Sequence, residues 1–379
     1  MKAGWKTSIL RDTCEMYQPK TISTKEMGAN GAYPVYGANG IIGRYDKFNH
    51  QYPQLLITCR GATCGSVNVS EPMSWITGNA MVIRPKSESI DLRFLEYVFR
   101  GGIDISRAIT GAAQPQITRT NLDPLEISYP TSVAEQKRIV AILDRAFEGI
   151  ATAKANAEKN IQNARSLFES HLQAVFAEVW QTCKLVTLSD LATDITDGSH
   201  LPPPKSLTGV PFITIGNIVK DIRKIDFSNT FMVPHAYFYG LKQNKKPRRG
   251  DLLYTVTGSF GIPVIVDDDV EFCFQRHIGL IRPKPETNSS WLYYLLLSPQ
   301  VFNQANERAT GTAQKTVSLR ALRCFAIPNV PLPQQSAAVA TLDALFEGTQ
   351  RLESLYQQKL VALDALRKSL LHQAFSGQL

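Results

Sequence analysis

The chain has 379 residues, of which 44% are hydrophobic, so it is long enough to form two or three domains with buried cores. Its formal net charge of +8 is compatible with a polyanionic partner, although many basic proteins bind no nucleic acid. The six cysteines are scattered without a CxxC pair, which argues against a disulfide framework and against a zinc site. The N-terminus has no apolar signal core, and no apolar run of about 18 residues could span a bilayer. We therefore expect a soluble cytoplasmic protein with no membrane partner.

The first block, residues 1–130, is rich in glycine, proline, β-branched and aromatic residues. Short apolar runs such as QLLITC (54–59) and AMVIRP (80–85) are bounded by turn residues, which predicts strands. A helix is expected over LRFLEYVFR (92–100). The block is therefore predicted to be a loop-rich α/β domain.

Residues 131–180 have a different character, with no proline and one glycine between 133 and 179. Apolar residues recur at steps of three and four, which predicts a helix with a seam for a partner helix. At about 1.5 Å per residue this helix is on the order of 60 Å long. Ser132 and Glu135 fit a capping box at its start. The proposed seam residues are Ile139, Ile142, Ile150, Ile161 and Phe168.

The second block, residues 181–333, again alternates predicted strands with turns, as in PFITIGNI (211–218) and IPVIVD (262–267). The run KQNKKPRRGD (242–251) places five cations within eight residues of a loop. That loop either contacts phosphates or only adds solubility. ITDGSHLPPPK (195–205) suits a loop presented to a groove, but it also suits any surface turn.

Residues 334–379 repeat the helical pattern, with seam residues expected at Leu342, Leu345, Leu352, Leu363 and Leu370. We expect the two helices to pair as an antiparallel coiled coil that holds the two blocks apart at opposite ends.

The chain carries an internal repeat. AILDRAFEGI (141–150) aligns with ATLDALFEGT (340–349) at an offset of 199, and MVIRPK (81–86) parallels GLIRPK (279–284). The loop GAAQPQIT (111–118) likewise corresponds to GTAQKTVS (311–318). A shift kept over this length indicates a tandem duplication with about 20 extra residues in the second block. The predicted fold class is thus α+β, with two loop-rich domains, two long helices and a pseudo-twofold internal repeat.

The excess positive charge lies in the globular blocks. Residues 1–130 hold 14 Lys and Arg against 11 Asp and Glu, a net +3, and residues 180–333 hold 17 against 12, a net +5. The helical segments 131–179 and 334–379 are balanced, with 6 against 6 and 4 against 4. Positive charge in two separated modules suits a bipartite nucleic-acid reader, but it is also compatible with ordinary solvated surfaces.

Motifs of the common enzyme classes are missing from the sequence. There is no GxxxxGK[ST] phosphate loop, and the glycines of YGANGIIG (36–43) have the wrong spacing for a dinucleotide fingerprint. The E-x-K at Glu135 falls on the first turn of a predicted helix, where it serves as a cap. We therefore predict no catalytic residues and no metal site in this chain, which binds and positions other molecules.

The order of motifs resembles the specificity subunit of type I restriction-modification systems. The first half carries YPVYGANGIIGRYDKF (33–48), LLITCRGATCGSV (55–67), WITGNAMVIRP (75–85), ITGAAQPQITRTNL (109–122) and EQKRIVAILD (135–144). The second half carries DGSHLPPP (197–204), VPFITIGNI (210–218), GDLLYTVTGSFG (250–261) and QRHIGLIRPK (275–284). One departure is Gln334-Gln335, where the first copy has Glu135-Gln136.

The resemblance implies domains at 1–130 and 181–333 that each recognise half of an asymmetric bipartite sequence in double-stranded DNA. It also implies spacer helices at 131–180 and 334–379 that set the gap between the half-sites. Two modification subunits would methylate adenine with S-adenosylmethionine, and restriction subunits would use ATP and Mg²⁺. This chain would bind none of these cofactors.

Loop residues of the types that contact bases or phosphates are the candidate DNA-binding set. They are Arg44, Arg60, Asn79, Gln114, Ser199, His200, Lys205, Lys245, Lys246, Arg248, Arg249, Thr257, Ser259, Gln275, Arg276 and Gln314. Two other hypotheses remain open at this point. The chain could be an assembly scaffold that docks acidic proteins, or an enzyme whose site has no recognised motif.

Overall fold

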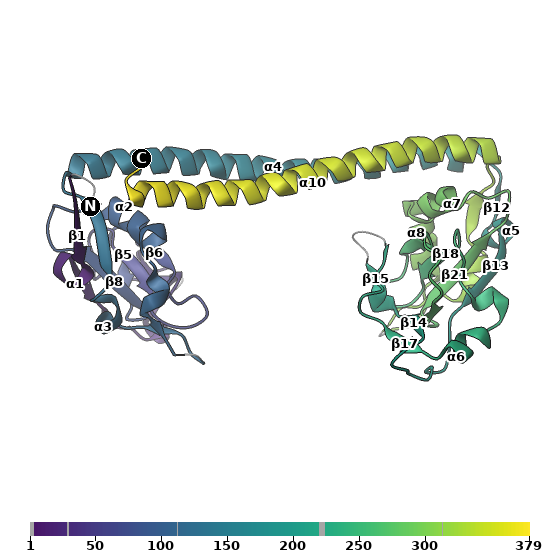
Figure 1. Cartoon of the computed structure of the whole chain (residues 1–379), viewed down its shortest axis with the longest axis horizontal. Helices are drawn as coiled ribbons and strands as arrows, with labels where there is room; N and C mark the ends of the chain where they lie inside the picture. The colour runs from purple at the N-terminus through teal and green to yellow at the C-terminus, as the bar shows by residue number, and fades with distance from the viewer. Residues whose placement is uncertain (1–3, 29, 112, 220–223, 313) are drawn as a thin grey trace. The chain divides into compact units, whose positions relative to one another are not determined.

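The computed structural model describes residues 4–28, 30–111, 113–219, 224–312 and 314–379. The chain divides into two compact units, one of residues 1–159 with 356–379 and one of residues 160–355. Each unit contains one globular domain and parts of two long helices, α4 (Val133–Thr182) and α10 (Leu332–Ser376) (Figure 1). Among the described residues, no helix is long and apolar enough to cross a membrane.

The first domain has a four-stranded sheet in the order β2-β8-β5-β6, a three-stranded sheet β4-β3-β7 and the two-stranded pairs β1-β11 and β9-β10. Strand β5 is buried at every position because its apolar side chains are covered on both faces. The elements are β1 (Trp5–Ile9), α1 (Leu10–Thr13), β2 (Cys14–Tyr17), η1 (Thr24–Glu26), β3 (Tyr33–Gly37), β4 (Gly40–Tyr45), β5 (Leu55–Thr58), β6 (Val67–Val69), β7 (Trp75–Ile76), β8 (Ala80–Pro85), α2 (Leu92–Tyr97), η2 (Val98–Gly102), η3 (Ile105–Ala108), β9 (Ile109–Thr110), β10 (Gln116–Ile117), α3 (Arg119–Leu122) and β11 (Glu126–Pro130).

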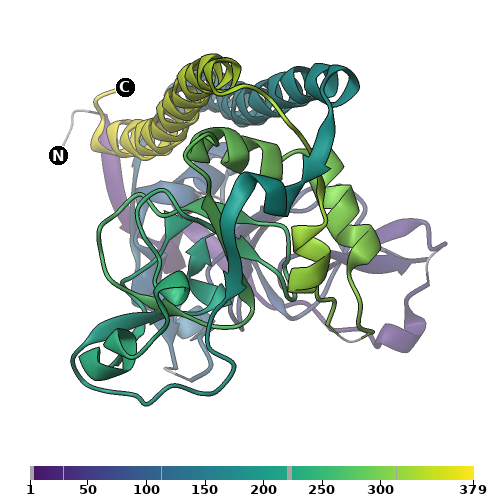
Figure 2. The same cartoon turned by 90° about the vertical axis from the view of Figure 1, so that its right-hand side faces the viewer.

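The second domain repeats this topology with sheets β13-β21-β18-β19 and β17-β14-β20 and the pair β12-β22. Both three-stranded sheets combine an antiparallel and a parallel pairing, which confirms the duplication predicted from the sequence. The elements are β12 (Leu185–Thr187), α5 (Leu188–Leu191), β13 (Ala192–Asp197), β14 (Val210–Ile213), η4 (Ile215–Asn217), β15 (Ile218–Val219), β16 (Lys224–Ile225), β17 (Phe231–Val233), α6 (His235–Tyr239), η5 (Gln243–Lys245), β18 (Leu252–Thr255), β19 (Pro263–Ile265), β20 (Cys273–Phe274), β21 (Ile278–Pro283), α7 (Ser289–Leu296), α8 (Pro299–Arg308), α9 (Leu319–Arg323) and β22 (Ala326–Pro328). In Figure 2 this domain faces the viewer, and its strands are drawn below the long helices.

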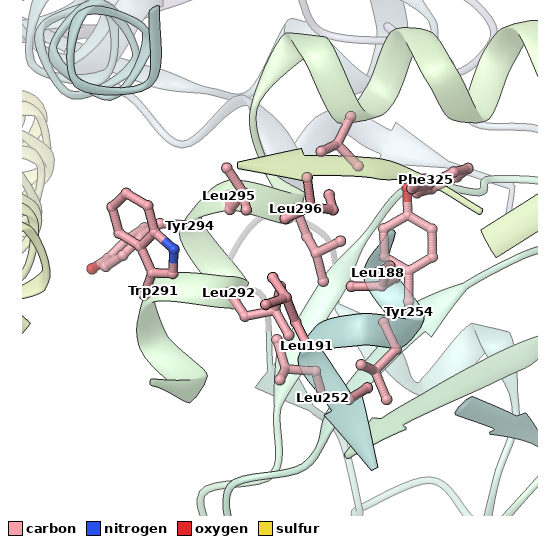
Figure 3. Packing of buried hydrophobic residues seen from close by; sticks show 14 of the residues in the cluster. Leu188, Leu191, Leu252, Tyr254, Trp291, Leu292, Tyr294, Leu295, Leu296 and Phe325 are labelled. Carbon is pink, nitrogen blue, oxygen red and sulfur yellow. The ribbon is translucent and has the colours of Figure 1, made fainter. Parts of the chain in front are cut away.

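The core of the second domain continues into the long helices. Leu252, Tyr254 and Phe325 are buried together with the residues of α7 (Figure 3). Trp291 of α7 packs against Phe176 of α4 with 4.9 Å between ring centroids. Burying a large apolar side chain contributes about 1.5–3 kcal/mol, so these contacts fix the helix to its domain.

A buried glutamine joins the first long helix to the first domain. Gln136 Nε2 donates to the carbonyls of Ser89 and Pro130 at 2.8 Å each, and its Oε1 accepts from the amide of Asp91 at 2.8 Å. Ser132 Oγ accepts from the amide of Glu135 at 3.4 Å, which is one of the two contacts of the capping box predicted beside it.

Gln335 makes the same three contacts in the second unit. Its Nε2 donates to the carbonyls of Val330 at 2.7 Å and Glu286 at 3.3 Å, and its Oε1 accepts from the amide of Asn288 at 2.8 Å. The glutamine, and not the glutamate before it, is therefore the repeated feature at the start of both helices.

The two helices run antiparallel within each unit. In the first unit, Lys154 Nζ lies 2.9 Å from Asp364 Oδ1, while Arg138 nearer the start of α4 donates to the carbonyl of Leu379. In the second unit, Arg165 pairs with Glu353 at 2.8 Å, and Phe168 packs on Phe346 with 5.2 Å between centroids. In both units, later residues of α4 face earlier residues of α10.

Leu352 was predicted to lie in the seam of α10, and this prediction is wrong. Leu352 is 41% exposed, and Leu355 and Leu366, which continue the spacing of three and four on the same helix, are exposed as well. The inward positions near Leu352 are Thr349, which is buried, and Glu353, whose carboxylate binds Arg165. Because these inward residues are polar, the spacing of apolar residues in the sequence indicated leucines beside them instead.

The other seam candidates lie inward to different degrees. Buried residues are Ile139, Ile150, Ile161, Phe168 and Leu342. Partly buried residues are Ile142, Leu345, Leu363 and Leu370.

Candidate nucleic-acid interface

The loop at 111–118 of the first domain is fixed against the end of strand β5. The amide of Gly61 donates to the carbonyl of Pro115 at 3.2 Å. One step further, the amide of Ile117 donates to the carbonyl of Cys59 at 2.9 Å. The loop is thereby held beside the residues that follow a buried central strand.

The corresponding loop at 311–318 of the second domain is held in the same way. The amide of Gly258 donates to the carbonyl of Lys315 at 3.0 Å, and the amide of Val317 donates to the carbonyl of Val256 at 2.8 Å. Equivalent loops therefore occupy equivalent places at the strand ends of the two domains.

The glycine shared by both loops is required by the backbone. Gly111 has φ +86° and Gly311 has φ +106°, a region that L side chains rarely adopt. A Cβ at either position would lie 2.5 Å from the carbonyl oxygen of Gln114 or Gln314. The glycine of the shared motif thus has a structural cause, while the side chains of both glutamines are exposed.

Three residues predicted to bind DNA lie together in the first domain, where β5 ends and β8 begins. The amide of Cys59 donates to the carbonyl of Asn79 at 3.3 Å, and Arg60 forms a bridge with Gln116. The side chains of Arg60, Asn79 and Gln114 are all exposed there.

Arg44 does not join this group. It lies on β4, where its Nε donates to the carbonyl of Gly31 at 2.6 Å and its Nη2 donates to the carbonyl of Ala32 at 2.7 Å. The guanidinium therefore braces the turn before β3, although its side chain remains exposed.

In the second domain, the loop after β13 meets the turn after β20. The amide of Ser199 donates to the carbonyl of Phe274 at 2.9 Å, and the amide of Arg276 donates to the carbonyl of Ser199 at 3.0 Å. Ser199 also bridges Gln275 in a parallel pairing. His200 and Arg276 line a cavity of about 260 Å³ together with Thr257 and Thr316. Residues far apart in the sequence are thus brought together at one surface.

His200 is oriented by a carboxylate that the sequence did not single out. His200 Nε2 lies 2.6 Å from Asp197 Oδ2, and Lys245 Nζ lies 3.4 Å from the other carboxylate oxygen. An ionised carboxylate can only accept, so Nε2 carries the hydrogen and Nδ1 of the neutral ring is an acceptor. The imidazole is 61% exposed, so this acceptor is accessible to a ligand.

A second cavity, of about 430 Å³, lies beside the first and also contacts His200. Its walls include Tyr237, whose hydroxyl donates to Ser199 Oγ at 2.9 Å. Tyr237 was missed because it is 38 positions from Ser199 in sequence and no motif connects the two. Asp197 could have been considered, since an acid three residues before a histidine is a common orienting pair.

The cations of the basic run 242–251 have different surroundings. Lys245 is paired with Asp197, and Lys246 Nζ donates to the carbonyl of Tyr239 at 3.0 Å. Arg249 makes an exposed 3.5 Å pair with Asp269. Within the described part of the chain, the exposed side chain of Arg248 has no hydrogen-bond or ion-pair partner. Of these four cations, Arg248 and the exposed Arg249 are the most available to a phosphate.

The remaining candidates differ in accessibility. Lys205 is exposed, with its Nζ 5.2 Å from the ring centroid of Phe231. Ser259 is exposed beside the repeated loop. Thr257 is buried and its hydroxyl accepts from Thr316 at 3.4 Å, so it supports the surface from below.

Cysteine chemistry is disfavoured in the described core. Burial raises the pKa of Cys14 to about 11 and that of Cys273 to about 12, so neither thiol is ionised near neutral pH. No group of three or more His, Cys, Asp or Glu residues suited to a metal ion occurs among the described residues.

Comparison with known proteins identifies the family. The family model for the type I restriction modification DNA specificity domain matches residues 2–163 and 182–361. The chain is 21% identical over 272 residues to the type I restriction enzyme EcoBI specificity subunit of Escherichia coli, covering 70% of this chain and 57% of that protein. It is 23% identical over 299 residues to the EcoKI specificity subunit of Escherichia coli strain K12, covering 73% and 62%. The matches thus span less than two thirds of these relatives' lengths.

Two solved structures share the fold. One comes from a description of the structural basis underlying complex assembly and conformational transition of the type I R-M system. It has a TM-score of 0.76 at 19% identity, and the match covers 100% of this chain and 99% of that chain. The HsdS subunit from Thermoanaerobacter tengcongensis has a TM-score of 0.64 at 20% identity, covering 100% and 98%. Because the family model matches two segments that together cover most of its length, this chain belongs to the type I restriction-modification DNA specificity family.

Proposed function

We propose that the protein is the sequence-specific DNA-binding subunit of a type I restriction-modification complex. Each domain reads one half of an asymmetric, bipartite double-stranded target. The observation that carries this proposal is the contact of the repeated loops, 111–118 and 311–318, with the residues that follow β5 and β18. The backbone hydrogen bonds of this contact are the same in both domains, but the side chains differ. Arg60 of the first copy forms a bridge with Gln116, whereas Thr257 takes that place in the second and pairs with Thr316. A common frame with different side chains suits two different half-sites.

We propose domain boundaries that follow from this division of labour. The target-recognition domains are residues 1–130 and 181–333. The spacer helices are residues 131–180 and 334–379, and they set the gap between half-sites. Antiparallel pairing within each unit supports this assignment, because two paired helices are stiffer than one.

The exposed and partly buried residues of these loops divide into two roles. Arg248 and Arg249 contact phosphates, which gives affinity without sequence information. Arg60, Asn79 and Gln114 of the first domain read base edges, as do Ser199, His200, Gln275 and Arg276 of the second. The acceptor at His200 Nδ1 would read an amino group, adenine N6 or cytosine N4, in the major groove.

Family membership supports a set of partners outside this chain. Two adenine methyltransferase subunits supply S-adenosylmethionine chemistry, and restriction subunits use ATP and Mg²⁺. The chain itself binds DNA, catalyses nothing and holds none of these cofactors. Its proposed setting is the cytoplasm, where chromosomal DNA is reached.

The test is to map methyladenine across the genome of the source cell with this chain present and deleted. One bipartite motif with two unlike halves and a fixed gap should lose its methylation on deletion. An unchanged methylation pattern would contradict the proposed function.

A further inference from the structure

Two equivalent arginines are placed differently in the two domains. Arg84 of β8 and Arg282 of β21 occupy the same place in the repeats MVIRPK and GLIRPK. The residue before the buried neighbouring strand is Gln54 in the first domain and Asp251 in the second. In the second domain both members of this pair, Arg282 and Asp251, are therefore charged. In the first domain only Arg84 is charged, because Gln54 is neutral.

In the second domain the arginine is neutralised within the protein. Arg282 Nε lies 3.0 Å from Asp251 Oδ1, and Arg282 Nη2 lies 2.7 Å from Asp251 Oδ2. The side chains are 13% and 4% exposed, so this is a buried, two-point pair. The same Nη2 also donates to the carbonyl of Lys246 at 2.8 Å.

In the first domain the hydrogen-bond partners of the arginine side chain are neutral. Arg84 Nε donates to Gln54 Oε1 at 3.2 Å, and its Nη2 donates to the hydroxyl of Tyr17 at 3.0 Å. Its one ion pair among the residues that the structure describes is with Glu15 at 3.8 Å, and that carboxylate is 56% exposed. A pair of this length near water contributes little, so the charge of Arg84 is mostly uncompensated.

Arg84 faces a cavity of about 430 Å³ whose other walls are neutral. Tyr17 donates its hydroxyl hydrogen to His50 Nε2 at 2.8 Å, and His50 Nδ1 donates to Asn49 Oδ1 at 2.6 Å. Burial and the charge of Arg84 lower the pKa of His50, so the imidazole is neutral at physiological pH. Among the described residues that line the cavity, Arg84 alone carries a full charge.

We propose that this cavity binds a carboxylate from an acidic side chain of a partner protein, in the role that Asp251 fills in the second domain. The cavity is at the other end of β5 and β8 from the proposed DNA-reading residues, because Leu55 pairs with Ile83 and Thr58 with Ala80. Tyr52, which is 70% exposed, and Leu92 line it as well. An apolar wall beside one cation suits an acidic peptide segment better than a nucleic-acid backbone.

The test titrates the full-length chain with sodium acetate and, separately, with methyl phosphate at constant ionic strength. The imidazole ¹H–¹⁵N signals of His50 report binding, since His50 is linked to Arg84 through Tyr17. Acetate should shift these signals to saturation. Gln54→Asp, which supplies the missing carboxylate internally, should weaken acetate binding at least tenfold.

Arg84→Gln should have the same effect and decides the matter if Gln54→Asp does not fold, with folding checked by circular dichroism. Arg107→Gln, which removes an exposed arginine of the same domain outside the cavity, should bind acetate as the unmodified chain does. Equal acetate binding by the folded variants and the unmodified chain would overturn the proposal. Methyl phosphate binding at least tenfold tighter than acetate would also overturn it, because the site would then be a phosphate site.

Discussion

Asp197 Oδ2 lies 2.6 Å from His200 Nε2, and this contact determines which hydrogen-bonding group His200 presents outward. Lys245 Nζ lies 3.4 Å from the second oxygen of the same carboxylate. The outward nitrogen, Nδ1, is then an acceptor in the neutral ring. A contact inside the protein therefore sets the chemistry at the proposed reading surface.

Replacing Asp197 with Asn should change base preference at one position of the second half-site. An amide can donate to Nε2, which would convert Nδ1 from acceptor to donor, so that it binds an acceptor such as guanine O6 or thymine O4 in place of the amino group of adenine N6 or cytosine N4. Binding of the assembled complex to targets with each of the four bases at every second-half position measures this. Asp226→Asn, at a carboxylate bonded to Ser228, should leave the preference unchanged. An identical base preference in Asp197→Asn would count against the reading role of His200.

Arg248→Ala combined with Arg249→Ala should weaken binding to all DNA sequences alike. The slope of log K against log salt should become shallower by roughly 0.9 for every phosphate that the loop no longer neutralises. Titrations of the complex on random duplex at several salt concentrations give this slope. The matched variant Arg351→Ala, at an exposed cation on α10, should have no effect. If the slope of the double variant were unchanged, the loop would be a solubilising surface.

Gln335→Ala should destabilise the second unit although it removes no apolar packing. The amide of Asn288 and the carbonyl of Val330 would be left without their buried partner. Each group left unpaired costs about 1–3 kcal/mol. Urea unfolding should report the destabilisation, whereas exposed Gln334→Ala should be close to neutral. Equal stabilities of the two variants would show that the glutamine is not the joint between helix and domain.

The free energy of unfolding should depend on pH through His50. Its pKa in the folded protein is lowered because burial and Arg84 disfavour the imidazolium. The unfolded histidine has a pKa of about 6.5, so below that pH the unfolded chain binds more protons. This contribution is fully present above about pH 6.5 and is lost as the pH falls through the folded-state value.

Urea unfolding between pH 5 and 8 checks the effect of His50→Gln, which should flatten the dependence. The part due to His277, whose pKa is also lowered, would remain. Exposed His171→Gln should keep the full slope. A slope in His50→Gln as steep as in the unmodified chain would refute the assignment.

Regular patterns in the sequence predicted the duplication, the strand-rich blocks and both long helices. Those features depend on apolar periodicity and on turn residues, which act locally. The seam failed at Leu352 because the buried positions beside it are Thr349 and Glu353, and a polar seam residue is held by a partner that periodicity does not show.

The candidate site was predicted less completely for a similar reason. Residue types in loops pointed to His200 and Arg276, but not to Asp197 and Tyr237 beside them. Tyr237 reaches Ser199 only after β14, β17 and β20 have formed one sheet. The roles of Lys246 and Arg44 depend on carbonyl groups of the folded backbone. Such contacts come from tertiary structure, which no short motif encodes.

The central claim is that each domain reads its own half of the target, and methyladenine mapping of two double variants tests it most directly. Arg60→Ala with Asn79→Ala should relax the motif in one half only. His200→Ala with Arg276→Ala should relax the other half only, with the gap unchanged in both cases. The claim would be contradicted if either double variant altered both halves alike, or if both variants left the methylated motif as it is in the unmodified cell.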